Sequence, residues 1–80
     1  MAQPARSLIA LHDRSDSVRL LAESRQARDE GQLLWAEALA RRARCFEPAS
    51  VAAAEMQCSL LRELGRTEQA LAISEQFAAG

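Results

Sequence analysis

The sequence predicts an all-α protein built from two antiparallel helical hairpins and a short N-terminal helix. Alanine supplies 17 of the 80 residues and leucine 11, whereas Ile, Val and Thr together supply five, a balance that favours helices over strands. Apolar residues recur at the three-and-four spacing of a helix face, as at Leu60, Leu61 and Leu64. The two interior glycines, Gly31 and Gly65, stand 34 residues apart, a period typical of stacked helical repeats.

Residues 1–16 form the predicted N-terminal segment. Leu8, Ile9 and Leu11 have the spacing of one helix face and predict a short helix over residues 5–12. The apolar stretch is short and is soon followed by charged residues, so it matches neither a signal peptide nor a membrane span. The expectation is therefore a cytoplasmic protein without membrane contact.

Residues 17–50 form the first predicted hairpin. Its first helix starts at Asp16 or Ser17, which are favourable N-cap residues, and ends at Gly31. Glycine permits the positive φ that a tight turn between two helices needs. The second helix returns antiparallel from this turn and stops before Pro48, because proline cannot continue a helix.

A stripe of small residues predicts how the helices of this hairpin pack. Ala36, Ala40 and Ala43 lie on one side of the second helix. Small side chains let neighbouring helices approach to about 8 to 9 Å, and Phe46 and Pro48 close the packing before the next unit. We therefore expect the core to form along this stripe.

Residues 51–80 form the second predicted hairpin, with a helix from near Ser50 to Gly65 and an antiparallel return. The returning helix has apolar residues at helical spacing: Ala70, Leu71, Ile73 and Phe77. A shift of 34 residues superimposes similar side chains: Ser24 on Cys58, Arg28 on Arg62, Asp29 on Glu63, Ala36 on Ala70, Ala38 on Ala72, and Leu39 on Ile73. The two hairpins are therefore predicted to be copies of one structural unit.

Over about residues 17–80, this pattern resembles the tetratricopeptide repeat family. The shared features are a small residue, a glycine seven residues later, an alanine five residues after that and a closing proline: Ser24, Gly31, Ala36, Ala43 and Pro48, then Cys58, Gly65 and Ala70. The large aromatic residue that the family has early in its first helix is replaced by Leu20 and, in the second unit, by Ala54. The resemblance implies a fragment of a right-handed α–α superhelix that binds other proteins.

Charge and composition argue against several classes of function. The formal net charge is −1, so no overall field attracts nucleic acid or an anionic membrane. His12 is the single histidine, and the sequence has no Ser-His-acid or Cys-His set and no glycine-rich phosphate loop, so no enzyme is expected. Cys45 and Cys58 lack a C-x-x-C spacing and are interpreted as buried thiols, with no metal and no cofactor.

The resemblance also implies a ligand groove formed by the first helix of each unit. Six residues are expected to face it: Leu21, Arg25, Arg28, Glu55, Ser59 and Arg62. Arg28 and Arg62 occupy equivalent positions, and their guanidinium groups could donate bidentate hydrogen bonds to carboxylates of a bound peptide. The alternative is that these arginines pair with Glu23, Asp29 or Glu63 on a solvated surface.

A large apolar pair, Leu34 and Trp35, lies on the side of its helix that the repeat pattern leaves exposed. One interpretation is that the N-terminal segment folds back and covers the pair. The other is that the pair, together with Phe77, forms an interface with another subunit or a different protein, because tryptophan is favoured at such interfaces.

The function expected from these features is that of a non-catalytic adaptor, which binds a peptide or a helical segment of a partner protein. Stacked repeats normally need about three units and a polar capping helix, so two units are expected to be covered by a partner or by a second copy. Two alternatives remain open at this point. One is a small dedicated chaperone or co-chaperone of a bacterial secretion or assembly system, and the other is a self-assembling structural homodimer.

Overall fold

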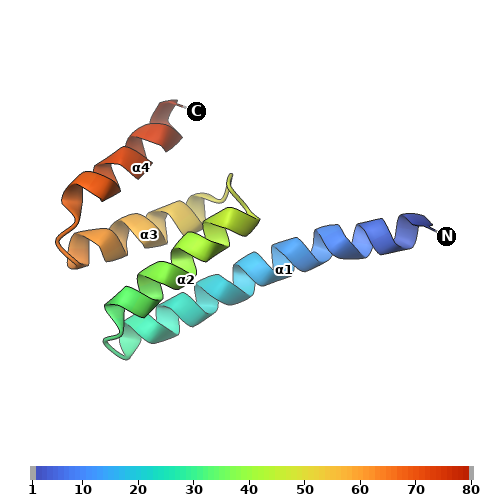
Figure 1. Cartoon of the computed structure of the whole chain (residues 1–80), viewed down its shortest axis with the longest axis horizontal. Coiled ribbons are helices and arrows are strands. Elements are labelled where there is room, and N and C mark those ends of the chain that lie inside the picture. The colour runs from blue at the N-terminus through green and yellow to red at the C-terminus, as the bar shows by residue number, and fades with distance from the viewer. Residues whose placement is uncertain (1, 80) are drawn as a thin grey trace.

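The computed structural model describes the backbone of residues 2–79 and the side chains of residues 16–77, and every regular element in this part of the chain is a helix. The helices are α1 (Ala2–Asp29), α2 (Leu33–Phe46), α3 (Val51–Glu63) and α4 (Thr67–Ala79). Successive helices pack on one another in chain order, so that α1 and α4 lie on opposite sides of the α2–α3 pair (Figure 1). The predicted all-α fold with helical hairpins is confirmed.

The helix α1 is longer than the sequence pattern predicted. It runs without a break through Asp16 and Ser17, where a new helix was expected to start. The N-cap preference of Asp and Ser has an effect only at the residue where a helix begins. Here Asp16 instead accepts a hydrogen bond from Arg19 one turn later, at 3.0 Å, and the Ser17 side chain is buried. None of the described helices has the length and apolarity needed to cross a bilayer.

The turn between α1 and α2 is a Schellman cap. Gly31 has a φ of 81°, and its N–H donates to the carbonyl of Arg28 at 3.0 Å. The N–H of Gln32 donates to the carbonyl of Ala27 at 2.8 Å. These two bonds satisfy carbonyl groups that the end of a helix leaves without partners, and they fix the direction in which α2 returns.

The turn between α3 and α4 repeats this cap with every residue shifted by 34 positions. Gly65 has a φ of 79°, and its N–H donates to the carbonyl of Arg62 at 3.0 Å. The N–H of Arg66 donates to the carbonyl of Leu61 at 2.7 Å. The period found in the sequence is therefore also a period of the hydrogen bonding.

One side-chain hydrogen bond is repeated in the same way. Ser24 Oγ of α1 donates to the carbonyl oxygen of Ala36 in α2 at 2.7 Å. In the second hairpin, Cys58 Sγ donates to the carbonyl oxygen of Ala70 at 3.4 Å. Both donors are buried. Each hairpin thus joins its two helices by a small side chain close to the turn.

Replacing Gly31 with alanine is expected to lower the free energy of unfolding by about 1 to 2 kcal/mol, because a Cβ atom disfavours the left-handed backbone conformation. No atom lies within 4 Å of the position that the Cβ would occupy, so the loss reflects backbone strain alone. Urea unfolding followed by circular dichroism measures it. Gly31→Asn is the control and should lose less, because asparagine tolerates this conformation. Equal losses in both variants would contradict the explanation.

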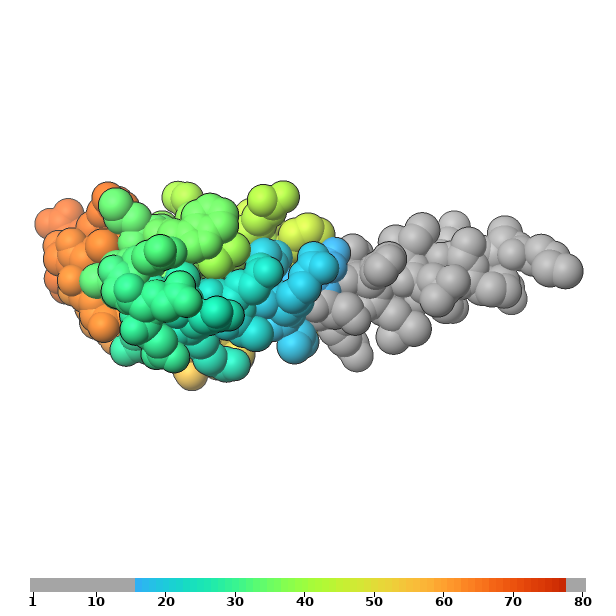
Figure 2. Space-filling view, turned by 90° about the horizontal axis from the view of Figure 1, so that it is seen from below, coloured from blue at the N-terminus to red at the C-terminus, as the bar shows by residue number. Residues whose placement is uncertain are grey.

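The main core lies between α1, α2 and α3. The alanine stripe of α2 is fully buried there, as the sequence predicted, and Leu60 is the large side chain that α3 contributes. The cluster consists of Leu20, Leu21, Ala27, Ala36, Leu39, Ala40, Ala43, Ala53 and Leu60. Figure 2 shows the surface above this core, where α1 and α2 lie against each other along one face.

A second, smaller cluster joins α3 to α4. It contains Cys58, Leu61 and Ala70, with Ile73 partly buried against it. The second hairpin therefore buries less apolar surface than the first, and α4 is the helix with the weakest hydrophobic anchoring.

Candidate functional site

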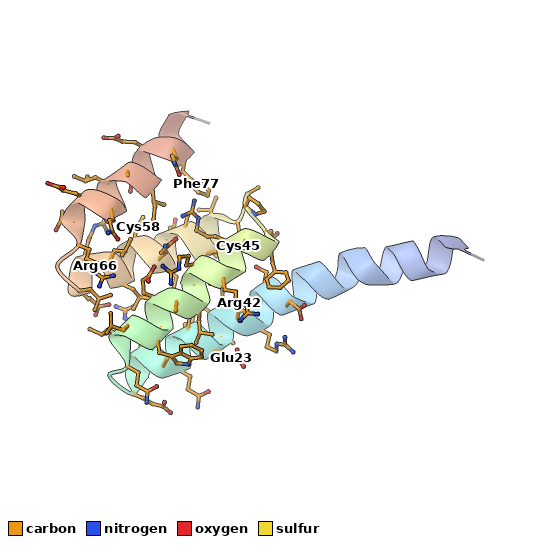
Figure 3. The ribbon with its side chains drawn as sticks, in the orientation of Figure 1. Glu23, Arg42, Cys45, Cys58, Arg66 and Phe77 are labelled. Atoms are coloured by element: carbon orange, nitrogen blue, oxygen red, sulfur yellow. The ribbon has the colours of Figure 1, made fainter. Side chains whose placement is uncertain are left out.

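A groove of about 540 Å³ lies between α3 and α4. Its lining consists of Val51, Ala54, Glu55, Cys58, Ser59 and Arg62 from α3, and Ile73, Ser74 and Phe77 from α4. Figure 3 labels two of these residues, Cys58 on α3 and Phe77 on α4. The groove is open to solvent and apolar over much of its length, and Val51 is 58% exposed within it.

Two substitutions between the repeated units explain why the groove exists. In the first hairpin, Leu20 and Leu21 of α1 are buried in the main core beside α2. The residues 34 positions later, at the same places on α3, are Ala54 and Glu55. A methyl group and an exposed carboxylate replace two leucine side chains, so the space between α3 and α4 stays unfilled.

Arginine side chains stand at both ends of this groove. Arg62 lines it near the turn into α4. At the other end, Arg44 of α2 lies over the Phe77 ring, with its Cζ atom 5.6 Å from the ring centroid. A second hollow of about 410 Å³, lined by Arg44 and sharing Val51 and Phe77 with the groove, continues the surface there. Against these two cations the lining holds one carboxylate, that of Glu55.

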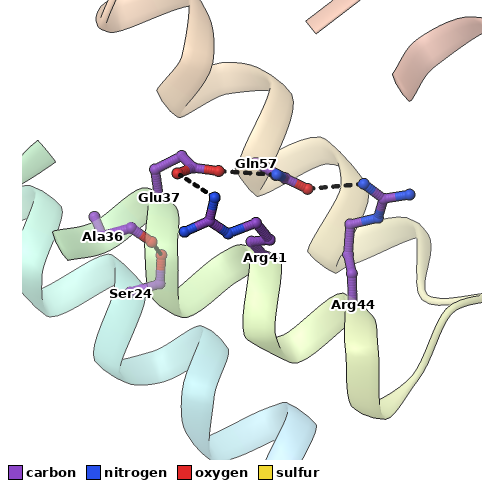
Figure 4. Close-up of polar contacts among 6 residues, drawn as sticks. All are labelled: Ser24, Ala36, Glu37, Arg41, Arg44 and Gln57. Atoms are coloured by element: carbon purple, nitrogen blue, oxygen red, sulfur yellow. Dashed lines mark hydrogen bonds and ion pairs between the residues drawn. The ribbon is translucent and has the colours of Figure 1, made fainter. Parts of the chain in front are cut away.

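A buried polar network connects α2 to α3 beside the groove (Figure 4). Gln57 Nε2 donates to Glu37 Oε2 at 2.8 Å, and Gln57 Oε1 accepts a hydrogen bond from Arg44 Nη1 at 2.8 Å. Arg41 approaches the other carboxylate oxygen of Glu37 at 3.9 Å. Only 4% of Glu37 is exposed, so its charge depends on these partners. The network holds Arg44 in place at the end of the groove.

Sequence reasoning missed this network. Glu37 lies directly beside Ala36 on the buried side of α2, and Gln57 occupies a helix face that is otherwise apolar. Each residue alone looks like an ordinary surface residue of a helix. The signal that could have indicated the network is the simultaneous presence of two polar residues on facing buried stripes.

The predicted ligand groove between first helices is not where the open surface lies. Leu21 is buried in the main core, while Arg25 is exposed. Arg28 Nε lies 3.1 Å from Glu63 Oε2, so it adopts the alternative considered from the sequence, an ion pair that joins α1 to α3. The three predicted residues of the second unit, Glu55, Ser59 and Arg62, do line a groove, but its other wall is α4.

Leu34 and Trp35 are exposed, at 62% and 56% of their surface. The side chains of Leu8, Ile9 and Leu11 lie outside the described residues. The exposed pair is a second apolar surface, separate from the groove, because neither residue lines it.

The cysteines differ from each other in their surroundings. Cys58 is buried, as predicted, but Cys45 is exposed near the end of α2, and both are free thiols. Cys45 was predicted to be buried because cysteine usually is; here it lies on the side of α2 away from the alanine stripe. Among residues 16–77, no three side chains of the metal-binding types gather at one place.

The α3–α4 groove thus combines an open apolar lining with an arginine side chain at each end. No model of a known protein family, no curated protein and no solved structure matches this chain.

Proposed function

We propose that this chain is a non-catalytic protein-interaction module that binds a segment of a partner protein in the α3–α4 groove. The observation that carries the proposal is an open apolar groove at the position where the first hairpin has buried leucines. Exposed apolar surface with a polar rim is typical of protein-binding sites. A partner that fills this groove removes the same kind of surface from water that Leu20 and Leu21 remove in the first hairpin.

The shape and chemistry of the groove favour a protein segment over a small molecule. Sites for small molecules are enclosed and hold a few convergent polar groups. This groove is open to solvent and continues into the second hollow beside Arg44, and its charged residues are Glu55, Arg62 and Arg44. The resemblance to tetratricopeptide repeats supports the same class of function. We place this function in the cytoplasm, where unpaired cysteines such as Cys45 and Cys58 stay reduced.

Selection from a phage-displayed library of random 16-residue peptides tests this function. We expect the selection to yield peptides that bind the chain. Their affinity should fall at least tenfold in the variant Ala54→Leu, which fills the groove with a leucine, the residue that the first hairpin has at the equivalent position, Leu20. Circular dichroism establishes that this variant is folded. Trp35→Ala is the matched control, because it removes the other exposed apolar surface and should leave these peptides bound.

Two outcomes would contradict the proposal. The first is that selection enriches no peptide at all, and the second is that it enriches peptides that tolerate Ala54→Leu and are lost with Trp35→Ala. The second outcome would move the binding surface to Leu34 and Trp35 on α2, the interface considered from the sequence.

A further inference from the structure

The first hairpin has a surface equivalent to the lining of the α3–α4 groove, and in this chain that surface is covered. The positions 34 residues before Ala54, Ile73 and Phe77 are Leu20, Leu39 and Ala43, and all three are buried. They share one core cluster with Ala53 and Leu60 of α3. The helix α3 therefore covers this face of the first hairpin, and the equivalent face of the second hairpin is open.

The charges are repeated together with this surface. Arg28 of the first hairpin pairs with Glu63 of the helix that covers it, at 3.1 Å. Arg62 is the equivalent residue of the second hairpin and lines the open groove. No carboxylate of residues 16–77 lies within 4.0 Å of its guanidinium nitrogens. An occupant placed as α3 is placed would bring a carboxylate to Arg62.

A second copy of the chain does not provide such an occupant through α1. The positions of α1 equivalent to Ala53 and Leu60, with which α3 enters the core, are Arg19 and Gln26. Both are exposed polar residues, and burying an arginine without a buried partner is costly.

A second copy does not fit through the outer side of α2 either. There the exposed pair Leu34 and Trp35 is followed by exposed Arg41 and Arg42, whose charges have the same sign as those of Arg44 and Arg62 at the ends of the groove. Charge repulsion therefore opposes this docking as well.

The covering helix α3 shows what its counterpart needs. It packs against the first hairpin with Ala53, Met56 and Leu60, which have i, i+3 and i+7 spacing, and it presents Glu63 at i+10. One position has to differ. Gln57 of α3 bonds to Glu37 of α2, and the residue of α4 equivalent to Glu37 is Leu71, which is 52% exposed. The occupant of the open groove should therefore be apolar at i+4.

We propose that the groove binds an amphipathic α-helix of a different polypeptide, which lies on α3 and α4 as α3 lies on α1 and α2 and pairs a carboxylate with Arg62. This proposal rests on the proposed function and specifies its ligand. The helix runs antiparallel to α4, with apolar residues at i, i+3, i+4 and i+7 and an acidic residue at i+10. Helix-in-groove recognition uses apolar anchors at this spacing.

The probe is a fluorescein-labelled peptide with the sequence of residues 50–64, changed by Gln57→Leu to match Leu71 and by Cys58→Ser to prevent disulfide formation. We expect a saturable rise in its anisotropy with the full chain, and loss of this rise with Ala54→Leu. The Ala54→Leu control separates binding in the groove from replacement of the chain's own α3. Circular dichroism should show a gain of helix in the mixture beyond the sum of the components.

A charge exchange tests the pose. Changing the peptide residue Glu63 to lysine is expected to weaken binding about fivefold, the scale of an exposed ion pair. The chain variant Arg62→Glu should weaken binding of the original peptide and restore binding of the lysine peptide. Binding without this restoration would overturn the pose, and so would the absence of saturable binding up to about 1 mM peptide, the range of the weakest specific complexes.

Failure of this inference is distinguishable from failure of the proposed function. Selected library peptides that bind in the groove but lack the helical pattern would leave the function standing and overturn the helical ligand. If neither the library nor the designed peptide binds, both proposals are wrong.

Discussion

Replacing Leu60 with alanine is expected to remove about 3 kcal/mol from the free energy of unfolding. Leu60 is fully buried and is the largest side chain that α3 contributes to the main core. Truncating a buried leucine costs about 2 to 5 kcal/mol, because apolar transfer energy is lost and a cavity remains. A domain of this size has a total stability of about 4 to 12 kcal/mol, so this one change removes a large part of it. Urea unfolding followed at 222 nm measures the effect.

Leu71→Ala is the matched control for this prediction. The chemical change is the same, but Leu71 lies on α4 and is 52% exposed. Its loss should cost less than about 0.5 kcal/mol, as is usual for surface positions. Similar losses at both positions would mean that the main core is not what stabilises the chain.

The hairpins were predictable from the sequence because their signals are local. Gly31 and Gly65 stand where a positive φ is required, and Pro48 follows the end of α2. Ser50, near which the second unit was expected to start, caps α3 by accepting a hydrogen bond from the N–H of Ala53 at 3.1 Å. Each of these signals acts within a few residues of its own position, so a single sequence is enough to read it.

The groove could not be predicted in the same way, because it depends on a difference between two distant positions. The sequence shows Ala54 and Glu55 where the first unit has Leu20 and Leu21. It does not show whether another side chain fills the resulting space. The structure shows that Phe77, which replaces the small Ala43 of the first unit, does not fill it and stays only half-buried.

The continuity of α1 was missed for a related reason. Asp16 and Ser17 are favourable at the start of a helix, but they are also tolerated within one when the surrounding turns outweigh their weak helix propensity. Asp16 gains an ion pair with Arg19, whereas Ser17 Oγ is buried without a hydrogen-bond partner, a cost that the rest of the helix offsets. Propensity at two positions was overridden by the interactions of the surrounding helix.

The polar network has its own consequence for stability. Replacing Gln57 with alanine is expected to cost about 2 to 3 kcal/mol. The amide of Gln57 donates the short hydrogen bond to the Glu37 carboxylate. Without it, the Glu37 side chain, which is 6% exposed, keeps only Arg41 at 3.9 Å as a partner. Arg44 also loses its acceptor at the end of the groove. Urea unfolding gives the loss of stability.

The repeat provides the control for this prediction, because the second hairpin has Leu71 where the first has Glu37. The double variant Glu37→Leu with Gln57→Leu removes both buried polar partners. Its free energy of unfolding should differ by less than about 1 kcal/mol from that of the original chain, because apolar replacement of a buried polar pair is often close to neutral. A double variant as unstable as Gln57→Ala would contradict the explanation by an unpaired buried carboxylate. The loss would then come from what both variants lack, the packing of Gln57 and the hydrogen-bond acceptor that it offers to Arg44.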